Sequence, residues 1–455
     1  MAKVKDMTVG SPAKNIIKFC LPLMMGNLFQ QFYNMADTII VGQFVGKSAL
    51  SAVGSVGSLN FLIIGSIIGL CSGFAIPVAQ SFGAKDYNKL KRIVANTIYT
   101  SLVLGAVITV CMVFVTKPLL HLLNIPDDIF KDAYNYIVII FAGIGATMLY
   151  NVVAGILRAL GDSKTPLYFL VFSSLLNIGL DLVLIIVFKM GVAGAAIATV
   201  ASQLISGLLC VYYSIKKFPM LALTKETKGF DLTYVGELLK NGVPMALQMS
   251  LTAIGSVMMQ SCVNSLGSEI IAGMTIGNKT QLMIVLPVET IGITMATYCG
   301  QHLGARKYKR IKKGIAIAVG LSFCYSFIAF FVSKYLGSYI GLLFIDKSET
   351  AVLALSQQYL DTCAWFYPIL GIIFVFRNAL QGMGYSLTAM TAGVFELVTR
   401  GVGGFGFVTK YGFDAACFVN PSAWLSADIF LIPATIVVMK KVKKKIYNEN
   451  EEQSE

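Results

Sequence analysis

Two acidic residues inside long apolar segments are the features of this sequence that most directly predict chemistry. Asp37 lies in GNLFQQFYNMADTIIVG, and Asp181 lies in LLNIGLDLVL, four residues after Asn177. A charged side chain inside a membrane-spanning helix costs roughly 2.5–3.5 kcal/mol on insertion scales, so such a residue is a functional candidate by default. Carboxylates in this setting could bind a hard cation or exchange a proton.

The segment around Asp37 carries a polar stripe. Four of its residues follow the spacing i, i+3, i+4, i+7, which places them on one helical face: Gln30, Tyr33, Asn34 and Asp37. A polar stripe on a helix embedded in lipid must face protein or water. We therefore expect this face to line the interior of the protein.

A depth count places further polar groups near these acids. Asp181 lies 16 residues after Thr165, about 24 Å along a helix, at a depth comparable to that of Asp37. Thr199 reaches the same level from the opposite side, about 12 Å into its segment. Two carboxylates, an amide and a hydroxyl could hold a monovalent cation, or the carboxylates could share a proton. The alternative is that each aspartate only hydrogen-bonds within the helix bundle.

Other intramembrane polar residues receive different interpretations. Glu289, in IVLPVETIG, is the main acid of the second half of the chain. Glu396 and Arg400 are four residues apart on one helical face, which favours a structural ion pair. His302 lies beside a basic cluster, and we expect it to be a surface or interface residue.

The sequence lacks motifs of nucleotide-driven, hydrolytic or metal-dependent chemistry. It contains no GxxxxGK[ST], GxSxG or HExxH, and its nine cysteines are dispersed through apolar runs without a CxxC pair. We therefore expect no enzymatic activity and no cofactor, so that energy for any transport must come from an ion gradient.

The elements that position these residues are membrane spans. The chain is 56% hydrophobic and 13% charged, whereas soluble domains carry about 25% charged residues. Apolar runs of about 20 residues, enough to cross a bilayer, predict an all-α polytopic membrane protein with twelve transmembrane helices. The first, second and eighth are expected to be bent or tilted. The predicted spans are 15–41, 50–81, 93–116, 132–157, 165–188, 191–214, 237–265, 274–302, 314–333, 355–379, 386–409 and 414–439.

The basic residues are distributed unevenly between the two sides of these spans. Of the 36 Lys and Arg residues, 27 fall on the side of the N-terminus, including Arg377, and seven fall on the other side. The positive-inside rule therefore predicts that both termini are cytoplasmic. The net charge of +13 is thus a topology signal, and we expect no nucleic-acid partner. The tail KKVKKK is expected to contact anionic membrane lipids.

The two halves of the chain repeat each other at an offset of about 221 to 223 residues. Pro22 in FCLPLMMGN matches Pro244 in NGVPMALQM, and AQSFGAKDYNKLKR matches GQHLGARKYKRIKK. Six spans per half give a parallel repeat with a site between the halves, and hence two pseudo-symmetric six-helix bundles. The predicted parts are an N-terminal lobe (1–215), a cytoplasmic linker (216–236), a C-terminal lobe (237–440) and a charged cytoplasmic tail (441–455).

Several stretches resemble the multidrug and toxic compound extrusion (MATE) family over residues 11 to about 440. They are SPAKNIIKFCLPLMMGNLFQQFYNMADTIIVGQFVG, PVAQSFGAKD, ILRALGDSKTPL, GVAGAAIATVASQ and GQHLGAR. The resemblance implies a prokaryotic inner-membrane exporter of amphipathic, often cationic drugs. It would work by alternating access, coupled to Na⁺ or H⁺ entry. A cleft contained within one chain needs no partner, so we expect a monomer.

The resemblance also implies site residues. Family members with an N-lobe coupling site match this chain at five positions: Asp37, Asn151, Asn177, Asp181 and Thr199. Tyr33 and Gln30 match polar first-helix positions near that site. We assign substrate binding to Gln30, Tyr33, Asn34 and Glu289. The second half has no Asn-x3-Asp counterpart, which favours coupling through the N-lobe.

Two other functions remain open at this point. A flippase for lipid-linked precursors, from the same broad superfamily, would need a strongly cationic cleft for phosphate groups. A membrane scaffold that transports nothing would give the intramembrane acids no purpose. The choice between Na⁺ and H⁺ also stays open, because carboxylates and amides serve either ion.

Overall fold

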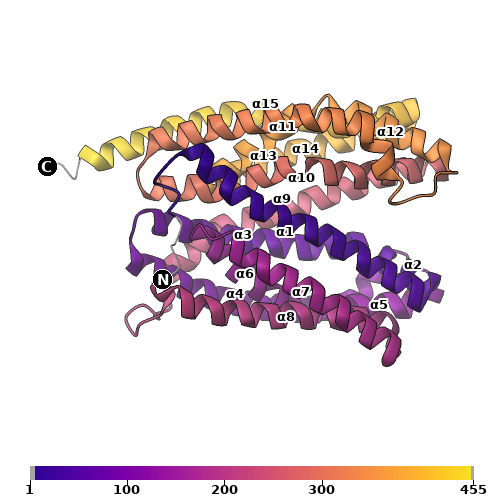
Figure 1. The fold of residues 1–455 in the computed structure, drawn as a ribbon, viewed down its shortest axis with the longest axis horizontal. Coiled ribbons are helices and arrows are strands. Elements are labelled where there is room, and N and C mark those ends of the chain that lie inside the picture. The colour runs from indigo at the N-terminus through magenta and orange to yellow at the C-terminus, as the bar shows by residue number, and fades with distance from the viewer. Residues whose placement is uncertain (1–5, 452–455) are drawn as a thin grey trace. The chain divides into compact units, whose positions relative to one another are not determined.

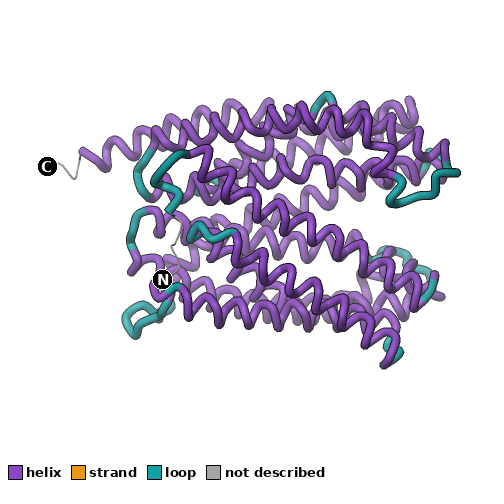
Figure 2. Tube along the Cα trace, viewed as in Figure 1, coloured by secondary structure: helices purple, strands orange, loops and turns teal. Residues whose placement is uncertain are grey.

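The computed structural model describes residues 6–451, which form helices joined by short loops (Figure 2). No strand occurs in this described part of the chain. Helices are expected here because lipid offers no hydrogen-bond partners. Each backbone N–H and C=O must therefore be satisfied within its own segment.

The helices follow one another as two similar series (Figure 1). The first series is α1 Pro12–Ile40, α2 Lys47–Ser55, α3 Gly57–Gly83, α4 Tyr87–Leu122, α5 Asp127–Ala142, α6 Ile144–Ala159, α7 Lys164–Leu182 and α8 Gly191–Lys217. The second is α9 Leu232–Asn264, α10 Ser268–Gly304, α11 Tyr308–Gly341, α12 Thr350–Ala364, α13 Tyr367–Gly382, α14 Ser386–Gly401 and α15 Thr409–Glu451. Short helical turns lie between some of these helices: η1 Val41–Val45, η2 Val183–Val187, η3 Pro219–Leu221 and η4 Val402–Val408.

The number of spans agrees with the prediction from sequence. Within residues 6–451, eight helices are long and apolar enough to cross a membrane, and two bent helix pairs raise the number to ten. One of the eight, Ser386–Asn448, contains both α14 and α15, and the polar α1 adds one more span. The total of twelve confirms the predicted fold class.

The sharpest bends lie in spans for which none was predicted. The fourth span is two helices, α5 and α6, at 45°, and the tenth is α12 and α13, at 60°. Gly143 separates the first pair, where an added Cβ would lie 2.2 Å from the Val200 side chain. Pro368 lies in the first turn of α13, where a missing N–H is tolerated and a new helix can begin.

The chain divides into two compact units whose boundaries fall inside α1 and α9. The first unit contains Leu21–Ala246, and the second contains Met7–Cys20 together with the chain from Leu247 onward. The repeat-related prolines Pro22 and Pro244 lie within three residues of these boundaries. A proline inside a helix removes one backbone hydrogen bond, so both helices are weakened where they pass from one unit to the other.

Each unit is held together by closely packed helices. In the first, α6 and α8 pack against each other, and α3 and α7 pack against them; in the second, α10 packs against α11, α12 and α13. Small residues permit these contacts. A Cβ added to Gly382 of α13 would lie 2.3 Å from the Ala296 carbonyl oxygen of α10. A Cβ on Gly73 would lie 2.4 Å from the Gly242 Cα.

Replacing Gly73 by alanine should therefore destabilise the first unit. The new methyl group would overlap the backbone of α9 at Gly242, and overpacking of this kind typically costs about 1–3 kcal/mol. We expect a lower midpoint of thermal unfolding in detergent, measured with a thiol-reactive dye. Gly65→Ala on the same helix is the matched control, because its Cβ would meet no atom within 4 Å. Equal midpoints for the two variants would contradict the close approach at Gly73.

Candidate functional site

The two predicted acids of the first unit both lie near the C-terminal ends of their helices. Asp37 lies three residues before the end of α1, and Asp181 lies one residue before the end of α7. A π-helical turn follows each helix, η1 after α1 and η2 after α7, and these turns contact each other and α8. Such turns interrupt regular helix geometry and are frequent at functional sites. The sequence analysis did not predict them.

Burial follows the predicted faces only in part. Asn177 is 1% exposed and Asp181 is 0% exposed, so their shared face on α7 points into the unit as expected. On α1, Tyr33 and Asp37 are half-buried. Gln30 and Asn34 of the same stripe are exposed in the structure.

Thr199 of α8 links the polar residues of the other two helices. Its Oγ1 accepts a hydrogen bond from Asn177 Nδ2 at 3.3 Å. The same oxygen shares a hydrogen bond with the Tyr33 hydroxyl, also at 3.3 Å. The structure therefore brings together residues from α1, α7 and α8 that are up to 166 positions apart in the sequence.

The polar side chains beside this link have acceptor oxygens for which the described residues supply no hydrogen-bond donor. Four buried oxygens accept no hydrogen bond from the described residues, namely Asp37 Oδ1, Asn177 Oδ1 and both carboxylate oxygens of Asp181. Asp37 and Asp181 also interact electrostatically with each other. Buried carboxylates of like charge without donors are costly, so this arrangement favours an added proton or cation.

Two other predicted residues lie apart from these contacts. Asn151 of α6 donates its side-chain amide to the Thr147 carbonyl of its own helix at 2.8 Å. Thr147 in turn donates to Gln203 of α8 at 2.7 Å. Glu289 is half-buried on α10 and belongs to the second unit.

The structure adds one residue that the sequence analysis missed. Tyr136 of α5 is 8% exposed and interacts electrostatically with Asp37, Asp181 and Tyr33. It is one of 20 tyrosines, and nothing in its local sequence distinguishes it. Only the packing of α5 against α2 and α8 brings it to the acids.

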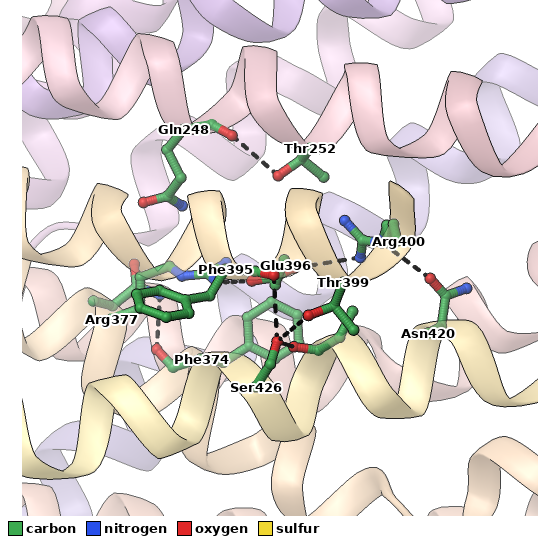
Figure 3. Close-up of polar contacts among 12 residues, drawn as sticks. Gln248, Thr252, Phe374, Arg377, Phe395, Glu396, Thr399, Arg400, Asn420 and Ser426 are labelled. Atoms are coloured by element: carbon green, nitrogen blue, oxygen red, sulfur yellow. Dashed lines mark hydrogen bonds and ion pairs between the residues drawn. The ribbon is translucent and has the colours of Figure 1, made fainter. Parts of the chain in front are cut away.

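The second unit contains a different polar cluster, drawn in Figure 3. Glu396 pairs with Arg400 at 3.3 Å, which confirms the predicted ion pair, and also with Arg377 of α13. Arg377 was counted among the basic residues on the side of the N-terminus, but its side chain is only 8% exposed and is paired inside the unit. Both arginines point toward Glu396 in the close-up.

The expectation for His302 was also wrong. The residue is 0% exposed. Its Nδ1 lies 2.8 Å from the Tyr298 carbonyl oxygen, and its Nε2 accepts a hydrogen bond from Arg310 Nε at 3.1 Å. Arg310 lies in the first turn of α11 and therefore reaches the imidazole from across the turn between α10 and α11.

Comparisons with known proteins agree with this architecture. The MatE family model matches residues 22–183 and again residues 244–405, at the offset of the predicted repeat. The chain is 30% identical to the probable multidrug resistance protein YpnP of Bacillus subtilis (strain 168), over 93% of this chain and 91% of that protein. It is 25% identical to the multidrug export protein MepA of Staphylococcus saprophyticus, over 84% of this chain and 85% of that protein.

A solved structure shows the same fold. It is described as an outward-facing conformation of a multidrug resistance MATE family transporter of the MOP superfamily. It superposes with a TM-score of 0.91 at 23% sequence identity, over 97% of this chain and 99% of that one. Two family matches that together span most of the chain, with a shared fold, show that this protein belongs to the MATE family of membrane transporters, which are not enzymes.

Proposed function

We propose that this protein exports amphipathic, often cationic organic compounds in exchange for Na⁺ or H⁺ bound at Asp37 and Asp181. The observation that carries the proposal is the set of four buried acceptor oxygens without donors, contributed by Asp37, Asn177 and Asp181. The coupling ion supplies the missing positive charge, and no other cofactor is required.

Coupling follows from where the ion binds. An ion shared by Asp37 and Asp181 joins α1 to α7, and α1 continues through Pro22 into the second unit. Binding therefore changes the free energies of the conformations that α1 can adopt. An ion that binds two states unequally shifts the equilibrium between them, so ion entry can drive release of the exported compound.

The substrate class rests on the relatives. YpnP and MepA are named as multidrug resistance or export proteins. We assign Gln30, Tyr33 and Asn34 on α1, and Glu289 on α10, to substrate contacts. An acidic side chain and an aromatic ring suit an organic cation. The competing flippase function would need unpaired cations for phosphate, whereas the buried Arg377 and Arg400 are neutralised in part by Glu396.

The orientation and assembly follow the sequence predictions. The bias of basic residues supports cytoplasmic locations for both termini, and we infer that the chain lies in the cytoplasmic membrane. The proposed transporting unit is a single chain surrounded by lipid.

Asp181→Asn should abolish coupled export while leaving the fold intact, because it removes a charge without changing side-chain volume. Ethidium efflux from proteoliposomes is measured under separately imposed Na⁺ and pH gradients. One gradient should drive wild type, and the variant should lose at least about tenfold in rate, the equivalent of about 1.4 kcal/mol. Asp128→Asn, at an exposed acid in the first turn of α5, is the control and should behave as wild type. Undiminished efflux by Asp181→Asn would overturn the proposal.

Thr199→Val should weaken ion binding without stopping transport. The substitution leaves Asn177 Nδ2 without its acceptor, and a buried unpaired polar group costs about 1–3 kcal/mol. The ion concentration for half-maximal efflux should therefore rise at least several-fold, while the maximal rate changes little. Thr199→Ser keeps the hydroxyl and should retain the wild-type value. Equal values for the valine and serine variants would show that the hydroxyl has no part in ion binding.

A further inference from the structure

A second buried group of acids and arginines lies entirely within the second unit. Its members come from three neighbouring helices: Arg377 of α13, Glu396 and Arg400 of α14, and Asp428 of α15. Their side chains are all more than nine-tenths buried, and Asp428 is only 3% exposed. Four ionisable groups at this depth must balance one another, because burial of an unpaired charge is very costly.

Glu396 forms the ion pairs of this group with both arginines. One of its carboxylate oxygens pairs with Arg377 Nη2 and the other with Arg400 Nη2. Arg400 also donates through Nε to Asn420 Oδ1 at 3.2 Å (Figure 3). Both arginines are therefore directed toward Glu396, and Arg400 is fixed by a second partner.

Asp428 is the member without a partner. Neither of its oxygens makes a hydrogen bond or ion pair with the described part of the chain, although both are buried. The Nε of Arg377 is likewise buried and bonded to no described residue. Asp428 interacts electrostatically with Arg377 and Glu396. An unused donor and two unused acceptors thus belong to the same cluster.

The charged groups that act on Asp428 come from α13 and α14. Within the described residues they are Arg377 and Glu396. The other elements that pack against α15, namely α11, α12 and η4, contribute no charged group to this set. Of these two groups, only the positively charged Arg377 stabilises an ionised Asp428, whereas Glu396 and burial oppose it.

Two arrangements satisfy this cluster. With Arg377 on Glu396, as observed, Asp428 has no donor, and its neutral, protonated form is favoured. With Arg377 turned to Asp428, that acid is ionised, and Glu396 keeps Arg400. The change breaks one O–H bond of Asp428 and delivers one proton to water, and the reverse change takes one proton up.

We propose that Asp428 is a proton-binding site of the second unit, loaded and unloaded as Arg377 exchanges between Glu396 and Asp428. This site shares no residue with the acids of the first unit. It gives the transporter a second, separate place to carry a proton. The proposed site at Asp428 does not depend on which ion binds at Asp37 and Asp181.

The test is infrared spectroscopy of the carboxyl C=O stretch in lipid-reconstituted protein. The background variant Asp37→Asn/Asp181→Asn/Glu289→Gln removes three intramembrane acids outside the cluster. We expect it to retain a protonated-carboxyl band, and further substitution Asp428→Asn should remove that band. Asp414→Asn, at an exposed acid on the same helix, is the matched control and should leave the band unchanged. A band that is absent from the background variant, or that survives Asp428→Asn, overturns the proposal.

A second variant tests whether Arg377 exchanges between Glu396 and Asp428 or has only a structural role. Glu396→Gln, in the same background, leaves Arg377 without its acidic partner and available to Asp428. Asp428 should then ionise, so its band should disappear although Asp428 itself is present. A band unchanged by Glu396→Gln would contradict the exchange. This readout does not involve transport, so it stands or falls separately from the export proposal.

Discussion

The cost of burying a carboxylate in a membrane protein is the constraint on which the rest of this structure depends. An ionised acid in that environment needs a donor, a cation or a proton. The two units share a fold and a repeated sequence, but they meet this requirement differently. In the first, Asp37 Oδ1 and both carboxylate oxygens of Asp181 are buried and accept no hydrogen bond from the described residues. In the second, Glu396 lies between two arginines. Similar scaffolds thus carry electrostatically different interiors.

The acids of the first unit lie on helices through which their charge can influence the conformation of α1. Asp37 lies on α1, which begins in one unit and ends in the other, with Pro22 near the boundary. Asp181 lies on α7, and both helices end in π-helical turns that pack together and against α8. Thr199 connects the two helices through Tyr33 and Asn177. A change of charge at this point therefore acts on α1, one of the two helices that pass from one unit to the other.

The sequence was sufficient for features that depend on composition and period, and insufficient for those that depend on packing. Apolar runs located all twelve spans, and the spacing of Asn177 and Asp181 predicted their common buried face. The bends at Gly143 and before Pro368 were missed because a glycine or proline within an apolar run does not by itself specify a break. His302 was misplaced because it lies beside a basic cluster in the sequence, and Arg377 was counted with the cations outside the spans. Tertiary contacts instead give both side chains buried partners. Tyr136 and Asp428 gain their significance only from helices distant in sequence.

The central claim is the proposal that the exported compound is exchanged for a Na⁺ or H⁺ bound at Asp37 and Asp181 of the first unit. The most direct measurement is the release of Na⁺ or H⁺ when ethidium is added to purified, ion-loaded protein in weakly buffered solution. The account predicts a saturable release of one of these ions from wild type and none from Asp37→Asn. Substrate binding without ion release from wild type, or equal release from Asp37→Asn, would contradict it.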